Sequence, residues 1–124
     1  MPKPSPKATL HLRVYFGAWG GLGPGKIKLL EMVDRHESIS AAGRSMKMSY
    51  RRAWLLVHSL NTMFKEPVVA TRHGGTGGGR ATLTPFGKTV VAAYREMERD
   101  AAASTARQLR SLQNALAKEP SAGD

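Results

Sequence analysis

The stretch that decides the fold is SISAAGRSMKMSYRRAW, Ser38–Trp54. Ser40 can cap a short helix over residues 41–46, because a serine hydroxyl accepts hydrogen bonds from the free amides at a helix start. The next two residues predict a tight turn. Ser49 is a second candidate cap, and it opens a longer helix that runs to about Phe64. A short helix, a tight turn and a longer helix together indicate a helix-turn-helix.

The longer helix has an apolar side that predicts how it is held. Residues spaced by three and four fall on one face of a helix, and here they are Ala53, Trp54, Val57, Leu60 and Phe64. We expect this face to pack on the domain and to fix the helix angle. Since Trp54 lies within the apolar periodicity, it is assigned to the core rather than to a stacking surface.

The start of the same helix is polar and cationic, with Ser49, Tyr50, Arg51 and Arg52 in its first turn. Free amides at a helix N-terminus attract phosphate. Arginine suits bidentate contacts with guanine, whereas serine and tyrosine often hold phosphates. These residues predict a DNA-recognition helix, with Arg44 and Lys47 nearby as further DNA contacts. An ordinary solvated surface is the alternative.

Upstream of this unit, residues 10–16 alternate between apolar and polar side chains, which predicts a half-buried strand. Residues 17–25 hold five glycines and a proline, so they form a loop. From that loop, Trp19 and Leu22 are expected to dock on the body. A helix should follow Pro24, with these inward residues: Ile27, Leu30, and Met32 or Val33.

Downstream, residues 68–72 and 80–83 predict a β-hairpin with a glycine-rich tip. A glycine loop between two arginines can follow the sugar-phosphate wall, and its arginines can enter a minor groove. We therefore interpret the hairpin as a DNA-binding wing, with these candidate contacts: Arg72, Thr76, Gly77 and Arg80. A mobile hairpin tip without a DNA role is the alternative.

The last predicted helix begins at Thr84-Pro85, a hydroxyl cap followed by proline at the first helical position. It should run over residues 85–117, about 50 Å at ~1.5 Å per residue, which is too long to lie on so small a core. An apolar stripe of Leu109, Leu112 and Leu116 continues along its far half. We interpret the stripe as a dimer interface in preference to a frayed helix.

Charge favours a polyanionic partner. The formal net charge is +10, and between residues 38 and 95 nine basic residues stand against one acid, Glu66. Such a field attracts nucleic acid. A membrane surface fits poorly, because the basic residues do not share one amphipathic helix with large apolar anchors.

No enzyme chemistry emerges from the residues. There is no cysteine, and the four histidines have no metal-ligand spacing. The glycine loop lacks the lysine and hydroxyl residue of a phosphate-binding loop, and no grouping of serine, histidine and carboxylate suggests a nucleophile. We therefore predict no catalytic residues, no metal and no cofactor.

Three segments taken together resemble a known family: residues 38–43, residues 48–54 and the glycine-rich run 74–84. They look like the N-terminal DNA-binding half of ModE-type molybdate-responsive regulators and are more distantly similar to LysR-type helix-turn-helix domains. The resemblance spans about residues 10–116. It implies a homodimer held by its helices and N-terminal strand on a two-fold operator. It also places Ser49–Arg52 on the recognition helix and Gly75–Arg80 on the wing.

The resemblance does not extend to the C-terminal oxyanion-binding β domains of full-length ModE-type regulators. The run Ser104–Gln108 looks like the serine-alanine-arginine sequence that binds molybdate there. Here it falls in a predicted helix without the strands that would position it, so a polar stretch of a dimer helix is the interpretation we favour. Molybdate sensing is left as an open alternative that the residues do not support.

The sequence thus predicts a mainly α protein with a small β-hairpin. We expect a disordered arm at 1–9, a winged helix-turn-helix at 10–84, a long dimerisation helix at 85–117 and a disordered tail at 118–124. The predicted function is a cytoplasmic homodimer that regulates transcription by sequence-specific binding to double-stranded DNA, without a membrane partner. A non-specific architectural nucleic-acid protein is the main alternative, and an oxyanion-responsive regulator is the other.

Overall fold

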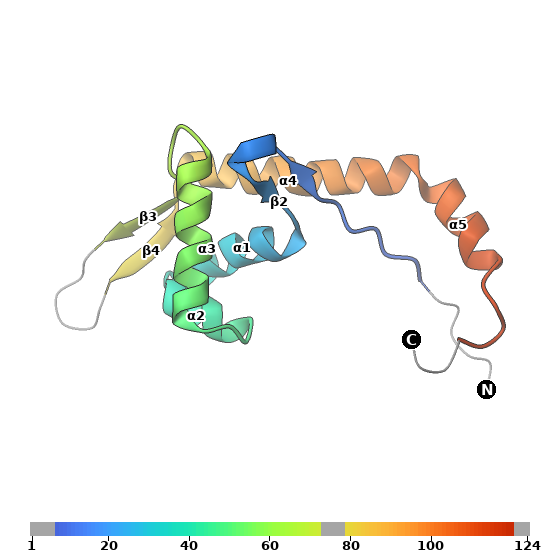
Figure 1. Ribbon diagram of the computed structural model, residues 1–124, viewed down its shortest axis with the longest axis horizontal. Coiled ribbons are helices and arrows are strands. Elements are labelled where there is room, and N and C mark those ends of the chain that lie inside the picture. The colour runs from blue at the N-terminus through green and yellow to red at the C-terminus, as the bar shows by residue number, and fades with distance from the viewer. Residues whose placement is uncertain (1–6, 73–78, 121–124) are drawn as a thin grey trace.

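The computed structural model describes residues 7–72 and 79–120, a mainly helical chain with two small antiparallel sheets in that part (Figure 1). The predicted wing residues Thr76 and Gly77 lie outside the described residues, as do parts of the predicted arm and tail. The helices are α1 (Pro24–His36), α2 (Ile39–Ser45), α3 (Tyr50–Met63), α4 (Pro85–Ser104) and α5 (Ala106–Asn114), with a 3-10 turn at Gly17–Trp19. The strands are β1 (Val14–Tyr15), β2 (Gly21–Leu22), β3 (Val69–Arg72) and β4 (Arg80–Leu83).

Helix α1 is the centre of the domain, in contact with α2, α3, α4 and β4. The helix was expected to follow Pro24 and in fact includes it at its first position, because proline presets the helical φ and needs no amide partner there. Its inward side chains have no solvent exposure: Ile27, Leu29, Leu30 and Val33. Glu37 then ends the helix with φ at 54°, in the left-handed region, and turns the chain toward α2.

The helix-turn-helix predicted at residues 38–54 is confirmed as α2, a tight turn and α3, although the first cap differs. Ser38, not Ser40, caps α2: its Oγ accepts from the Ala41 amide at 3.0 Å. Ser38 has the extended backbone that a cap requires, whereas Ser40 is already helical. Ser49 caps α3 as expected, accepting from the Arg52 amide at 3.1 Å.

The assignment of Trp54 to the core was wrong. The buried side of α3 consists of Ala53, Val57, Leu60 and Met63, and Trp54 lies one step around the helix with 44% of its surface exposed. The helical periodicity of α3 predicted an apolar stripe that is wider than the side of α3 that α1 and α2 cover. Phe64, just past the helix end, is half-buried.

The N-terminal segment forms a shorter strand than residues 10–16 predicted. Only Val14 and Tyr15 pair, with Leu22 and Gly21 respectively. Leu22 is buried as expected, but Trp19 does not dock on the body, since it is 70% exposed. The short 3-10 turn carries the Trp19 side chain outward before the chain returns as β2.

The β3–β4 hairpin is confirmed, with register from Val69 opposite Leu83 to Arg72 opposite Arg80. Helix α3 holds β3, because Asn61 Oδ1 accepts from the Val68 and Val69 amides at 2.9 Å each. The end of α1 holds β4, because the Leu83 amide donates to Asp34 Oδ1 at 3.2 Å. The hairpin therefore projects from the helix-turn-helix at a fixed place (Figure 1).

The single helix expected over residues 85–117 is instead two helices, α4 and α5, with a break at Thr105. The hydroxyls of Ser104 and Thr105 both donate to the Ala101 carbonyl, at 3.3 and 2.6 Å. A serine or threonine hydroxyl that bonds to a carbonyl of the preceding turn competes with the backbone hydrogen bonds of the helix and often bends it. Helix α4 runs away from the core and α5 turns off its far end (Figure 1). The predicted start at Thr84-Pro85 is confirmed, with Thr84 Oγ1 accepting from Gly87.

Two contacts fix α4 on the domain. Tyr94 is fully buried, and its hydroxyl donates to the Leu12 carbonyl at 2.5 Å. Arg95 pairs with Glu31 of α1 at 2.7 Å and with Glu98 at 2.6 Å. Hydrogen bonds to Glu31 and then to Glu98 raise the pKa of Arg95 above its ordinary value. The charged form of Arg95 therefore links α1 to α4.

Candidate nucleic-acid interface

The first turn of α3 is open to solvent. Ser49, Tyr50, Arg51 and Arg52 are all exposed, with Tyr50 at 58%. The Ser49 cap satisfies one amide of this turn and fixes where the helix begins. Because the opposite side of α3 is locked into the core, the four side chains project from a rigid support.

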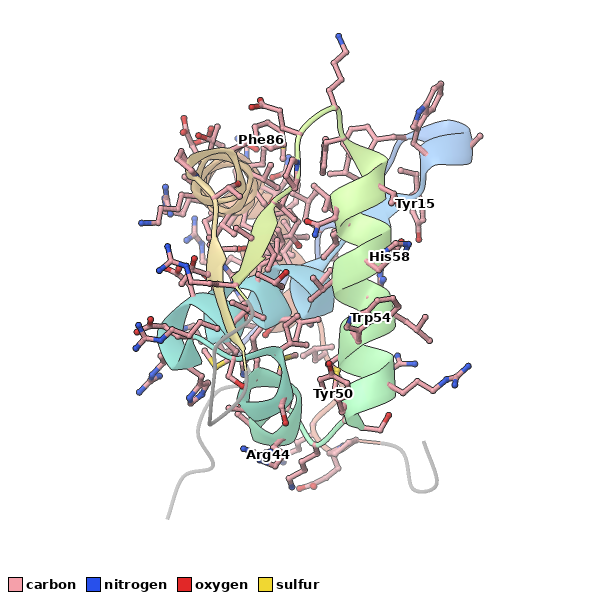
Figure 2. All side chains as sticks on the ribbon, turned by 90° about the vertical axis from the view of Figure 1, so that its left-hand side faces the viewer. Tyr15, Arg44, Tyr50, Trp54, His58 and Phe86 are labelled. Carbon is pink, nitrogen blue, oxygen red and sulfur yellow. The ribbon has the colours of Figure 1, made fainter. Side chains whose placement is uncertain are left out.

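A groove of about 460 Å³ lies between α2, α3 and the hairpin. Helix α2 contributes Arg44, α3 contributes Tyr50 and Trp54, and the hairpin contributes Arg72 and Arg80. Figure 2 shows Arg44, Tyr50 and Trp54 along the helix-turn-helix on the side from which the hairpin projects. The tertiary structure thus brings together four residues that the sequence nominated separately, and adds Trp54.

The charged side chains around the groove are cationic, apart from Glu37. Arg44 donates from Nη1 to Ser40 Oγ at 2.9 Å and stays exposed. Arg80 lies 3.7 Å from Glu37, and the two side chains are 71% and 48% exposed. A pair so open to water contributes little to stability, so Arg80 can exchange Glu37 for a phosphate at small cost.

Not every predicted contact lines this groove. Arg52 points toward a second hollow of about 310 Å³, where Arg13 and Tyr15 lie beside it. Lys47 occupies the turn with φ at 58° and is exposed. Arg13 was missed by the sequence reasoning, although strand alternation at residues 10–16 placed it on the polar side. These residues extend the cationic surface to the other flank of α3.

Trp54 and His58 form a stacked pair on the exposed side of α3. Their ring centroids are 5.1 Å apart and their planes differ by 5°. Tyr50, Trp54 and His58 follow one another at spacings of four residues, and Figure 2 shows them in succession along the helix. The sequence could have revealed this aromatic face through its spacing of four residues, because residues four apart lie on the same side of a helix, here beside the buried side.

The predicted dimer residues lie on α5 and just beyond it. Leu112 and Leu116 are 67% and 58% exposed, and Leu109 is half-buried. Residues 7–9 lie against this helix, with the Ala8 amide donating to Gln113 Oε1 at 3.0 Å. The run Ser104–Gln108 spans the break between α4 and α5.

The described residues also bear on membrane and metal roles. Over residues 7–72 and 79–120, no helix combines the length and apolar character needed to cross a membrane. In the same residues, histidines and carboxylates do not gather in groups of three or more that could hold a metal ion.

Comparison with known proteins gives sequence relatives, while no protein-family model matches the chain. The chain is 38% identical over 99 residues to the molybdenum-pterin-binding protein MopB of Rhodobacter capsulatus, covering 80% of this chain and 35% of that protein. It is 38% identical over 77 residues to the molybdenum transport protein ModE of Azotobacter vinelandii, covering 62% and 28%. It is 32% identical over 71 residues to the DNA-binding transcriptional dual regulator ModE of Escherichia coli K12, covering 57% and 27%. The chain spans about a third of the length of these relatives.

Proposed function

Because the chain is related by sequence to ModE-type transcription regulators, we propose that it binds double-stranded DNA sequence-specifically and regulates transcription as a homodimer. The observation that carries this proposal is the cationic groove between α2, α3 and the hairpin. Its residues come from three elements, and its scaffold is the helix-turn-helix of residues 38–63 followed by a hairpin.

In the proposed complex, the first turn of α3 enters a major groove. Arg51 is the best-placed base reader, because it is exposed on the rigid helix and arginine matches the two acceptors on guanine. Ser49 and Tyr50 contact phosphates at the groove edge. Arg72 and Arg80 of the hairpin contact the neighbouring sugar-phosphate backbone or the minor groove of the DNA.

The homodimer is proposed from the exposed apolar side chains at the C-terminal end. Leu112 and Leu116 gain free energy by leaving water, and two-fold pairing buries the same patch on both copies. A dimer also doubles the DNA contacts, and its two α3 helices address half-sites one helical turn apart.

The decisive experiment is selection of bound fragments from genomic DNA, followed by affinity measurements at one fixed salt concentration. We expect Arg51→Ala or Arg52→Ala to weaken binding to the selected fragment by ~1–3 kcal/mol where a base contact is lost, and to relax base preference at that position. Arg99→Ala is the matched control, since it removes an exposed arginine from α4, outside both the candidate groove and the proposed dimer residues. Unchanged affinity and base preference in both α3 variants would contradict the proposal.

The alternative of a non-specific architectural protein is tested in the same assay. It predicts steep salt dependence with equal affinity for selected and random DNA, because phosphate contacts carry no sequence information. Selective competition by the chosen fragment over random DNA supports the regulator.

An oxyanion effector is a separate alternative, prompted by the names of the relatives, which refer to molybdenum binding and transport. In this chain the run Ser104–Gln108 lies across two helices rather than among strands, so we propose regulation without that effector. Molybdate added in a thermal unfolding experiment should leave the midpoint unchanged, because a ligand that binds only the folded state raises it.

A further inference from the structure

The indole of Trp54 stands out in the candidate interface because it is large, apolar and half open to water. It is 44% exposed, and leaving so large an apolar side chain in water is unfavourable unless a partner covers it. It lies in the groove lined by Arg44, Tyr50 and Arg72. Its partner His58 is exposed too, so the stack does not serve to bury either ring in the core.

The stack does fix where the indole lies. Helix α3 sets the Cα positions, and the His58 ring lies parallel to the indole at 5.1 Å between centroids. One face of the indole therefore lies against the neighbouring ring, while the 44% of Trp54 that is exposed can meet a ligand. A side chain held in one orientation loses little conformational entropy when it makes a contact.

The surroundings of Trp54 restrict the chemistry of that ligand. Cationic side chains of Arg44 and Arg72 border the groove and suit phosphates, while Trp54 offers an apolar surface in the same groove. In the major groove, the C5 methyl of thymine is the apolar group that a base pair presents. A duplex whose phosphates meet the arginines thus brings base edges, with their methyl groups, to the level of the indole.

We infer that Trp54 is a specificity-determining residue that recognises thymine through its C5 methyl group, with His58 as the residue that positions it. The inference rests on the DNA-binding function proposed above. It adds a base preference that the arginines of α3 do not supply, because arginine reads guanine and phosphate.

The test replaces thymine by deoxyuridine, one position at a time, in the fragment selected from genomic DNA. This change removes one methyl group and leaves base pairing intact. We expect at least one position at which it weakens binding of the unmodified protein about fourfold, from the free energy of burying one methyl-sized group. Trp54→Ala should bind the thymine and deoxyuridine forms of that position equally.

The chain offers a matched control in its second tryptophan. Trp19 is also exposed, at 70%, but it lies with Met63 and Phe64 at the opposite end of α3. Trp19→Ala should keep the full loss on deoxyuridine substitution. His58→Ala should reduce that loss without abolishing binding, because it leaves the indole in place and removes the ring that orients it.

A fluorescence measurement keeps the inference testable if Trp54→Ala fails to fold. Trp19→Phe leaves Trp54 as the sole tryptophan, and saturation with the selected fragment should then shift or quench its emission. The complementary Trp54→Phe protein, which reports on Trp19, should show no such change.

The outcomes separate the inference from the function on which it rests. If the unmodified protein selects no fragment, the proposed function fails and this inference fails with it. If it selects a fragment but tolerates deoxyuridine at every position, only the inference is overturned. Equal weakening of the thymine and deoxyuridine forms by Trp54→Ala also overturns it, as does preferential binding of the single strand, which indicates stacking on unpaired bases instead.

Discussion

Gly87, in the first turn of α4, lies directly against the carbonyl oxygen of Val68, the residue just before β3. A Cβ built on Gly87 would overlap that oxygen, and neither backbone can give way easily, because Val68 is fully buried. The contact lets α4 pack against the base of the hairpin that borders the candidate DNA groove. It also gives a reason for a glycine where helix propensity favours other residues.

We expect Gly87→Ala to destabilise the protein by at least ~1–3 kcal/mol, the usual cost of forcing atoms into a packed core. Gly25→Ala is the control, since Gly25 is in the first turn of α1 and a Cβ there meets nothing within 4 Å. Urea unfolding of both variants checks the prediction. A Gly87→Ala protein as stable as the unmodified one would show that α4 can move away from Val68.

Asn61 connects α3 to the hairpin, and its loss should be costly. Asn61→Ala leaves the amides of Val68 and Val69 without their acceptor in a buried site, at ~1–3 kcal/mol for each unsatisfied group. Unfolding in urea measures this loss. Thr62→Ala, which removes an exposed side chain from the same turn, should change stability by less than ~0.5 kcal/mol.

Ser49 should separate stability from DNA binding. Ser49→Ala removes the α3 cap and should cost ~1 kcal/mol. Ser49→Asp keeps an acceptor for the Arg52 amide, so it should retain stability, yet it places a negative charge where the phosphates are proposed to lie. Thermal unfolding and DNA affinity, measured on both variants, check this. Full DNA affinity in Ser49→Asp would contradict the proposed docking of α3.

Tyr94 should make stability depend on pH in the alkaline range. Burial raises the pKa of this phenol above its ordinary value, and the nearby Glu98 carboxylate adds to the shift. An unfolded chain releases the Tyr94 proton at about pH 10. The contribution of Tyr94 to the unfolding free energy is therefore complete below that pH. It is lost as the pH rises through the higher pKa that Tyr94 has in the folded protein.

Tyr94→Phe isolates this effect from the other groups that titrate there. It should lower stability by ~1 kcal/mol at neutral pH by removing the hydrogen bond to Leu12. Its unfolding free energy should then fall less steeply above pH 10 than that of the unmodified protein. Parallel slopes in the two proteins would refute a raised pKa for Tyr94.

The dimer proposal predicts the mass of the protein in solution. The unmodified chain should sediment as a dimer, and Leu112→Glu with Leu116→Glu should convert it to a monomer by placing charges in the interface. Both side chains are largely exposed in the single chain, so the double variant should still fold. A monomer at all concentrations for the unmodified chain would leave these leucines without the proposed role.

The sequence alone determined the order of helix-turn-helix, hairpin and C-terminal helical segment, the Ser49 and Thr84 caps and the cationic start of α3, because caps, turns and helical spacing are local properties of the chain. It wrongly predicted that Trp54 and Trp19 pack on the body. Which apolar residues become buried depends on the elements that pack against them, and the sequence does not show those elements. It also missed the break at Thr105, where two hydroxyls compete with the helical ladder. Only the tertiary structure brought Arg44, Trp54 and Arg72 to one groove. Asn61 of α3 holds β3 through a nearby stretch of chain, but the bond from Leu83 to Asp34 of α1, which holds β4, joins residues far apart in the sequence and cannot be read from local patterns.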